Sequence, residues 1–366
     1  MTDGIAIRAD LRLARAAFAL ELKFTAPARG ITGILGHSGS GKTTLLRCIA
    51  GLESECRGTV AMNGATWQDA TRFVPPHRRA IGFVFQDARL FPHLTVRRNL
   101  EYGMRRGAGG GVGFDEAVDL LGLAPLLARK PDGLSAGEAQ RVAIGRALLR
   151  APSVILMDEP LANIDPGRRR EVLPFLERLH GLLTIPILYV SHSIDEVVRL
   201  CDHLVLMRDG RVEGAGPLQE VIGQAGPLGE EFGSVLRGTV HAIDAGYELT
   251  EIDTSAGRLL VPGRHGGPGR QVRLRIQARD VSITLARSTD SSILNVLPAR
   301  VEAIAPRDGG QVDVQLRAGG AMLWSRISRR SCDQLGLVPG RECHAQIKGV
   351  AVRGDLDPAA PEDGAP

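Results

Sequence analysis

The stretch that decides the fold is G-H-S-G-S-G-K-T, residues 36–43. It matches the pattern G-x-x-x-x-G-K-T, in which glycines let backbone N–H groups wrap around phosphates. Lys42 is placed to reach the β- and γ-phosphates of a nucleotide, and the hydroxyl of Thr43 to bind Mg²⁺. A plain glycine-rich turn does not explain Lys-Thr at this spot. The predicted nucleotide-binding residues are Gly36, His37, Ser38, Gly39, Ser40, Gly41, Lys42, Thr43 and Thr44.

Predicted strands and helices alternate on both sides of this loop. Residues 5–35 alternate in hydrophobicity and end in a short buried strand, and residues 43–50 follow as a helix. The apolar runs V-I-L-M at 154–157 and I-L-Y-V at 187–190 are typical of parallel strands buried on both faces. This order predicts a parallel α/β core with a helical insertion. The other expected elements are strands at 58–62, 81–85 and 204–207, a helix at 166–180, helices within about 87–150, and a flexible loop at 107–113.

Polar side chains follow three of the predicted strands. Asp158 and Glu159 end one strand, where Asp158 is expected to hold Mg²⁺ through water and Glu159 to polarise an attacking water. His192 follows another strand and is expected to reach the γ-phosphate, although a lone histidine there is usually a polar cap. Gln86 follows a third strand as a candidate sensor of metal or water, with an ordinary loop glutamine as the alternative.

The stretch L-S-A-G-E-A-Q-R, residues 134–141, looks like a second anion site. A turn of small residues feeds a helix whose N-terminal N–H groups attract negative charge. Ala136 tolerates helical or extended backbone, whereas a positive φ would cost it energy. We therefore expect a negative φ at Ala136, with Ser135 and Gly137 free to meet a phosphate.

The pattern changes near residue 233. Residues 235–287 and 293–352 carry short strands and glycine-rich turns, which predict small β-barrels and suggest a duplicated module. We expect a β-rich linker or first barrel half at 234–288 and a second β-domain at 289–353. The tail at 354–366 is rich in proline and acidic residues and is expected to be disordered.

Composition limits the class of protein. A chain of 366 residues predicts two or three domains, and its net charge of +4 is spread rather than gathered into a stripe, so no nucleic-acid partner is expected. Five scattered cysteines are expected to be free thiols in a reducing cytoplasm. No secretory signal or membrane-spanning run is found, so any work at a membrane requires docking on another protein.

The ordered motifs of residues 1–233 resemble the ATP-binding subunits of ABC transporters. The resemblance implies a P-loop ATPase fold, with a RecA-like α/β core and a helical subdomain at about 87–150. It assigns Walker A to 36–43, the Q-loop to Gln86, the signature to 134–138, Walker B to 154–158, the D-loop to 161–165 with Asp165, and the switch histidine to His192.

This resemblance also implies how the motifs work. Lys42, Thr43 and Asp158 hold MgATP, with Gln86 as a further metal contact; Glu159 activates water, and His192 and Gln86 sense the γ-phosphate. Two subunits sandwich two ATP molecules, so that the signature of one caps the ATP of the other. The residues facing the partner's ATP are Ser135, Ala136, Gly137 and Glu138. Phe18 is the nearest candidate to stack on adenine.

The remaining features favour an importer. A single ATPase unit without a fused membrane domain or a long heptad arm argues against exporters, repair ATPases and tandem translation factors. Residues 86–100 look like the Q-loop region of molybdate importers, which implies that a permease helix rests near Arg89–His93. The resemblance implies a homodimer under two permease subunits, a periplasmic molybdate-binding protein, and a place on the cytoplasmic face of the bacterial inner membrane.

The C-terminal part resembles the molybdate/tungstate-binding Mop module, and so implies an all-β domain of OB-like barrels. The matching stretches are 291–301, 323–328 and 345–352. A tetrahedral dianion needs several N–H and O–H donors and a cation, which Ser291, Ser292, Asn295 and Lys348 supply. A polar barrel rim with a solvated lysine is the alternative. An importer of sulfate, sugar or polyamine, or a soluble oxyanion sensor, stays open as an alternative function.

Overall fold

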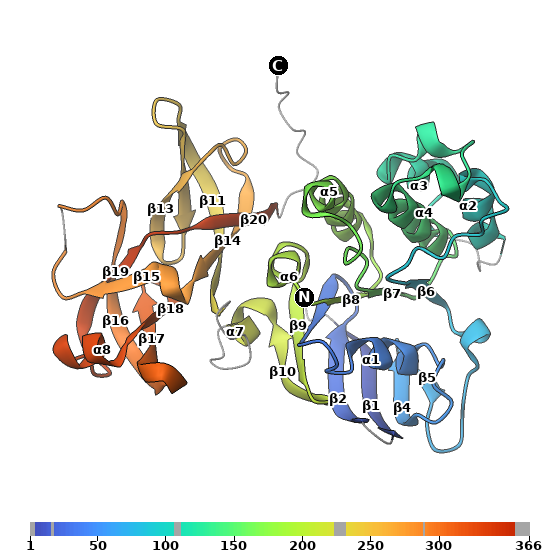
Figure 1. The fold of residues 1–366 in the computed structure, drawn as a ribbon, viewed down its shortest axis with the longest axis horizontal. Helices are drawn as coiled ribbons and strands as arrows, with labels where there is room; N and C mark the ends of the chain where they lie inside the picture. The colour runs from blue at the N-terminus through green and yellow to red at the C-terminus, as the bar shows by residue number, and fades with distance from the viewer. Residues whose placement is uncertain (1–3, 16–17, 106–110, 223–231, 288–289, 356–366) are drawn as a thin grey trace. The chain divides into compact units, whose positions relative to one another are not determined.

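The computed structural model describes residues 4–15, 18–105, 111–222, 232–287 and 290–355 (Figure 1). Most of the expected loop at 107–113, and the expected tail from residue 356 onward, lie outside these residues. The chain divides into two compact units after Pro217, and each is described by itself. The change of pattern expected near 233 marks where short strands begin, whereas the second unit already starts with the helix α7 (Leu218–Ile222).

The first unit is built on a six-stranded sheet that carries the phosphate loop. Its order is β10-β9-β3-β8-β7-β6, and every neighbouring pair is parallel except β10 with β9. The expected parallel α/β core is therefore confirmed. The strands are β3 (Ile31–Leu35), β6 (Ile81–Val84), β7 (Val154–Asp158), β8 (Ile187–Ser191), β9 (His203–Arg208) and β10 (Arg211–Pro217). The helices that follow β3, β7 and β8 are α1 (Lys42–Ile49), α5 (Pro166–Leu182) and α6 (Ile194–Leu200).

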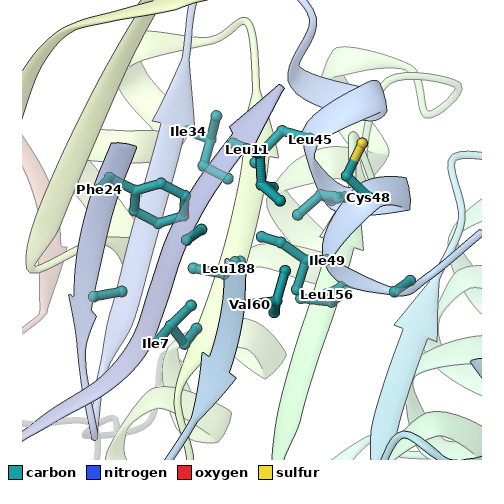
Figure 2. Packing of buried hydrophobic residues seen from close by; sticks show 14 of the residues in the cluster. Ile7, Leu11, Phe24, Ile34, Leu45, Cys48, Ile49, Val60, Leu156 and Leu188 are labelled. Carbon is teal, nitrogen blue, oxygen red and sulfur yellow. The ribbon is translucent and has the colours of Figure 1, made fainter. Parts of the chain in front are cut away.

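A second, antiparallel sheet of order β2-β1-β4-β5 packs against α1. Side chains of β1 alternate between buried and exposed, so one face of the sheet supplies core residues such as Ile7 and Leu11. Figure 2 shows these residues beside Ile49 of α1 and Leu188 of the parallel sheet. The helix after the phosphate loop is thus fixed between two sheets. The strands are β1 (Ile5–Arg15), β2 (Phe18–Pro27), β4 (Arg57–Met62) and β5 (Ala65–Gln68).

The expected helical insertion is present between β6 and β7. It contains α2 (Val96–Met104), α3 (Phe114–Leu120) and α4 (Ala136–Leu148), and α4 begins directly at the signature stretch. Short 3-10 turns lie at Pro76–Arg78, Ala124–Leu126 and Pro131–Gly133. Within the described residues, no helix is long and apolar enough to cross a membrane. The five cysteines are buried free thiols, as expected.

The second unit contains two five-stranded antiparallel sheets, of order β13-β12-β11-β14-β20 and β15-β19-β16-β17-β18. The expected division at 288/289 does not separate them, since each half of the chain gives one strand to the other sheet. β15 pairs with β19, and β20 pairs with β14, so both sheets share one core. The strands are β11 (Gly233–Asp244), β12 (Leu249–Thr254), β13 (Gly257–Pro262), β14 (Gln271–Gln277), β15 (Val281–Thr284), β16 (Asn295–Pro306), β17 (Gln311–Ala318), β18 (Ala321–Ser328), β19 (Glu342–Ile347) and β20 (Ala351–Asp355). The short helix α8 (Arg329–Gln334) and 3-10 turns at Ala278–Asp280 and Asp308–Gly310 connect these strands.

Candidate nucleotide site

The phosphate loop folds around the side chain of Lys42. Its Nζ donates to the carbonyl oxygens of Gly36 at 2.8 Å and of His37 at 3.0 Å. The ammonium is buried, and burial lowers the pKa of Lys42 although Glu159 and Asp158 oppose this shift. A buried cation at the start of a helix, in a loop of backbone N–H groups, is suited to an anionic ligand.

Phe18 of β2 lies against the last glycine of the loop. A Cβ atom on Gly41 would lie 2.6 Å from Cζ of the Phe18 ring, and Gly41 has φ of 98°, so only glycine fits here. The ring of Phe18, which the sequence suggests as the residue that stacks on adenine, therefore lies beside the phosphate loop. Its role in stacking stays a prediction.

Thr43 and Asp158 meet across the first turn of α1. The Thr43 hydroxyl donates to Oδ1 of Asp158 at 2.8 Å. Burial raises the pKa of Asp158, while the hydrogen bond from Thr43 counteracts the shift. A hydroxyl and a carboxylate are hard oxygen donors of the kind that Mg²⁺ prefers, so this pair fits the predicted metal.

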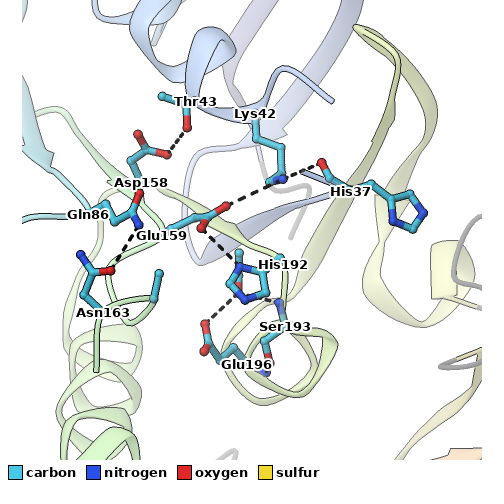
Figure 3. Close-up of polar contacts among 12 residues, drawn as sticks. His37, Lys42, Thr43, Gln86, Asp158, Glu159, Asn163, His192, Ser193 and Glu196 are labelled. Carbon is cyan, nitrogen blue, oxygen red and sulfur yellow. Dashed lines mark hydrogen bonds and ion pairs between the residues drawn. The ribbon is translucent and has the colours of Figure 1, made fainter. Parts of the chain in front are cut away.

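Glu159 connects the end of β7 to both neighbouring motifs. Its Oε1 lies 3.8 Å from Nζ of Lys42, and its Oε2 lies 3.3 Å from Nδ1 of His192 (Figure 3). The backbone of Glu159 has φ of 43°, a left-handed conformation that costs a non-glycine residue on the order of 1–3 kcal/mol. Strain of this kind is typical of functional positions, and the carboxylate of this residue faces Lys42 of the phosphate loop.

Gln86 is exposed after β6, and its contacts lead to the D-loop rather than to Asp158. Its Nε2 lies 3.5 Å from Oδ1 of Asn163 (Figure 3). Nδ2 of Asn163 in turn donates to Asp87 at 2.9 Å. Asp165 ends the D-loop as the N-cap of α5, where it accepts from the backbone N–H of Arg168. The structure therefore gathers Lys42, Thr43, Asp158, Glu159 and His192 closely, and joins Gln86 to them through the D-loop.

The signature stretch forms a capping box at the start of α4. Oε2 of Glu138 accepts from the backbone N–H of Ser135 at 2.7 Å, and Oγ of Ser135 accepts from the backbone N–H of Glu138. The bond from Ser135 lowers the pKa of Glu138. Ala136 is the first residue of α4 and is not among the residues with positive φ, which confirms the negative φ predicted for it. Among the described residues, no hydrogen bond or ion pair joins Ser135, Gly137 or Glu138 to the phosphate loop of the same chain.

Sequence reasoning missed the residues that hold these motifs in place. Glu196 lies three residues after Ser193, a spacing that predicts a capping box. Its carboxylate instead accepts from the hydroxyls of Tyr189 at 2.9 Å and Ser191 at 2.8 Å. Arg169 of α5 lies 3.7 Å from the same carboxylate. The spacing of Ser193 and Glu196 points to a helix start, but it does not predict the contacts of Glu196 with Tyr189, Ser191 and Arg169.

The candidate oxyanion residues in the second unit differ in their surroundings. The Asn295 side chain is buried and bonds the backbone of Leu260 twice, accepting at 2.7 Å and donating at 2.9 Å. It thereby joins β16 to β13. Ser291 accepts from the backbone N–H of Ile293, and Ser292 and Lys348 are exposed.

Comparison with known proteins follows the same division of the chain. Residues 20–162 match the ABC transporter family, and residues 291–354 match the TOBE domain. The protein named "Molybdenum import ATP-binding protein ModC 1" of Azotobacter vinelandii is 51% identical over 360 residues, which cover 96% of this chain and 99% of the relative. The chain belongs to the ABC transporter family of ATP-binding proteins.

Other relatives and structures agree with this membership. "Molybdenum import ATP-binding protein ModC" of Pseudomonas aeruginosa is 50% identical, covering 96% of this chain and 99% of the relative. The solved structure of cbiO1 from Clostridium perfringens, part of the transporter complex cbiONQ, is 28% identical with a TM-score of 0.52, covering 59% of this chain and 90% of that one. A nucleotide-free ATP-binding cassette from an ABC transporter, 24% identical with a TM-score of 0.53, shows the same fold over 62% of this chain and 98% of its own.

Proposed function

We propose that this chain is the ATP-hydrolysing subunit of an ABC importer that powers molybdate uptake across the inner membrane. The observation that carries the proposal is the placement of Glu159 between Lys42 and His192 at the carboxyl edge of the parallel sheet. The substrate class follows from near full-length relatives at about half identity that are named molybdenum import ATP-binding proteins.

Each residue of the site has a separate task in hydrolysis. Lys42 exchanges its bonds to the carbonyl oxygens of Gly36 and His37 for bonds to the β- and γ-phosphates. Glu159 accepts a proton from the attacking water, and His192 orients Glu159 and contacts the γ-phosphate. Gln86 responds to the γ-phosphate through the loop that follows β6.

Thr43 and Asp158 would hold Mg²⁺, with Gln86 as a further contact. When bound, the ion supplies positive charge that offsets the charge of the phosphates. The hydrogen bond from the Thr43 hydroxyl to Asp158 holds these two oxygen donors side by side.

The active form is a homodimer in which each ATP is shared. Ser135, Ala136, Gly137 and Glu138 of one copy face the ATP held by Lys42 of the other. The Ser135 oxygen accepts from the backbone N–H of Glu138, so its own O–H stays available to donate to the partner's phosphate. The carboxylate of Glu138 accepts a hydrogen bond from the Ser135 N–H, and this bond keeps the carboxylate within the capping box.

Two permease subunits complete the membrane assembly, on the cytoplasmic face of the inner membrane. The surface near Arg89–His93 receives a permease helix. Arg89 has φ of 45° and its guanidinium lies 4.2 Å from the Phe85 ring centroid, while Phe91 packs on Tyr102. The periplasmic molybdate-binding protein acts through the permease.

The C-terminal domain binds oxyanion as a regulator. Ser291, Ser292 and Lys348 are accessible, and Asn295 acts by holding β13 against β16. A polar rim without ligand is the alternative for this surface.

Capture from membranes separates the importer from a soluble oxyanion sensor. Affinity-tagged chain, purified from detergent-solubilised membranes, should bring down two copies of one integral membrane protein for each pair of ATPase chains. The control is the same capture from the soluble cell fraction, with the same detergent added. Recovery of the chain from cytosol alone, with no membrane subunit, would instead favour the sensor.

A further inference from the structure

The D-loop, residues 161–165, is held on one side by the loop that carries Gln86. Asn163 is the contact: its Nδ2 donates to Asp87 at 2.9 Å, and its Oδ1 faces Gln86 Nε2 at 3.5 Å. The loop after β6 is thus connected to the middle of the D-loop through Asn163. The segment begins two residues after Glu159, which places it next to the reacting groups.

Arg169 holds the other side of the D-loop. Its Nε donates to the carbonyl oxygen of Ile164 at 2.7 Å, and its Nη2 donates to that of Ala162 at 3.3 Å. A third guanidinium nitrogen, Nη1, lies 3.7 Å from Oε1 of Glu196. Because guanidinium is planar with fixed donor directions, these contacts fix the D-loop relative to Glu196.

Glu196 in turn holds the segment that carries His192. Its Oε2 accepts from the hydroxyls of Tyr189 and Ser191, and Ser191 also accepts from the backbone N–H of Ser193. Burial raises the pKa of Tyr189 well above its usual value, so this hydroxyl stays a donor. Figure 3 shows Glu196 beside the turn with His192 and Ser193. Glu196 is only 7% exposed, so these hydrogen bonds supply the polar partners that a buried carboxyl group needs.

We propose that the Arg169–Glu196 pair couples the switch histidine to the D-loop, so that contact of His192 with the γ-phosphate repositions residues 161–165. The contacts form a closed path from Glu159 through the D-loop, Arg169, Glu196 and Ser191 to His192, which returns to Glu159. Arg169 and Glu196 are positioning residues, since in the part of the chain that the structure describes their side-chain contacts go to the D-loop, to each other and to Tyr189 and Ser191. This inference rests on the proposed ATP hydrolysis.

A second ion pair between the same helices supplies a matched control. Arg199 of α6 bonds Glu177 of α5 at 2.7 and 2.8 Å. The side chains of Arg199 and Glu177 are 27% and 10% exposed, against 27% and 9% for Arg169 and Glu196. The control pair links α5 to α6, and among the described residues neither side chain forms a hydrogen bond or ion pair with the D-loop or the His192 turn.

The test compares Arg169→Gln and Glu196→Gln with Glu177→Gln in the full-length chain. Phosphate release is measured against ATP concentration, and thermal unfolding is measured alongside. We expect kcat to fall about tenfold or more in the first two variants, with little change in KM and a loss of cooperativity, because the reacting groups are misplaced rather than lost. Glu177→Gln should stay within about twofold of wild type while melting at a similarly lowered temperature.

Three outcomes overturn the coupling: unchanged turnover in Arg169→Gln, unchanged turnover in Glu196→Gln, or an equal loss of kcat in Glu177→Gln. Arg169→Lys keeps the positive charge but lacks the planar set of donors, so it is a second variant should Arg169→Gln fail to fold. It should also lose cooperativity, and normal cooperativity in it would count against the coupling. Absence of phosphate release from wild-type chain removes the proposed function as well, whereas normal wild-type turnover with an unaffected Arg169→Gln removes this inference alone.

Discussion

Nδ1 of His192 lies 3.3 Å from Oε2 of Glu159, although 33 residues separate them in the chain. The two residues follow β7 and β8, which are adjacent and parallel, so their carboxyl ends meet at one edge of the sheet. The other oxygen of Glu159 faces Lys42 at 3.8 Å. One carboxylate therefore contacts both Lys42 of the phosphate loop and His192, the arrangement on which the proposed role of Glu159 as the base rests.

Replacing this carboxylate should stop turnover and leave ATP binding intact. Glu159→Gln keeps the size and one acceptor oxygen but cannot take up a proton. We expect kcat to fall by about 10²–10⁴-fold, the usual contribution of a general base. Phosphate release and equilibrium ATP binding are the two measurements. Turnover close to that of wild type in Glu159→Gln would show that another group is the base.

Asp158→Asn should have opposite effects on stability and on metal binding: a more stable nucleotide-free chain and a weaker metal site. The folded-state pKa of Asp158 is raised, mainly by burial, so its stabilising contribution is complete below the usual value of 3.8 and is lost as pH rises through the folded-state pKa. At neutral pH the ionised carboxylate therefore costs stability in the nucleotide-free chain. We expect Asp158→Asn to raise the melting temperature without nucleotide and to abolish the stabilisation by MgATP.

The same variant tests the pH dependence. Wild-type chain, melted without nucleotide, should gain a contribution from Asp158 as pH falls toward 3.8, and Asp158→Asn should lack that contribution. A lowered melting temperature of Asp158→Asn at neutral pH would mean that the Thr43 contact outweighs the cost of burial.

The sequence predicted the parts of the site that are written as short contiguous patterns. The residues of 36–43 lie together in the chain, and Asp158, Glu159 and His192 follow apolar runs that mark buried strands. Contacts such as Asn163 with Asp87, 76 residues apart, leave no local pattern and were missed. They depend on how the helical insertion returns to the sheet.

The second unit shows the same limit of local reasoning. Its short strands were expected, but the partners of β15 and β20 were not, since each pairs with a strand from the other half of the domain. Short strands take partners that complete a sheet edge, and the sequence period does not encode that choice. The type of side chain suggests that Asn295 binds an oxyanion, whereas in the structure its amide group forms hydrogen bonds to the backbone of Leu260.

Replacing Ser135 of the signature stretch should reduce ATP turnover more than its effect on stability explains. Ser135→Ala removes the N-cap of α4, a loss of about 1 kcal/mol, and also removes the O–H that we propose donates to the partner's ATP. Ser328→Ala removes the N-cap of α8 and is the matched control. We expect comparable changes in unfolding free energy but a loss of ATP turnover only in Ser135→Ala. Equal turnover in both variants would argue against a shared site.

Substitutions of Asn295 and Lys348 should have different effects, the first on stability and the second on molybdate binding. Asn295→Ala leaves the Leu260 N–H and C=O without their partner, which costs about 1–3 kcal/mol for each buried group left unsatisfied. The Lys348 side chain is exposed, and its backbone N–H, which donates to Asp280, stays in place in Lys348→Ala. Lys348→Ala should therefore melt like wild type and bind molybdate more weakly. Calorimetry with molybdate, and with sulfate as control, measures the difference. Undiminished molybdate binding by Lys348→Ala would remove that lysine from the oxyanion site.

Uptake of labelled molybdate by cells that lack this gene tests the central claim most directly. Wild-type chain supplied in trans should restore uptake, Glu159→Gln produced at the same level should not, and labelled sulfate should be taken up equally in all three strains. Restoration of molybdate uptake by Glu159→Gln, or restoration of sulfate rather than molybdate uptake by the wild-type chain, would contradict the account.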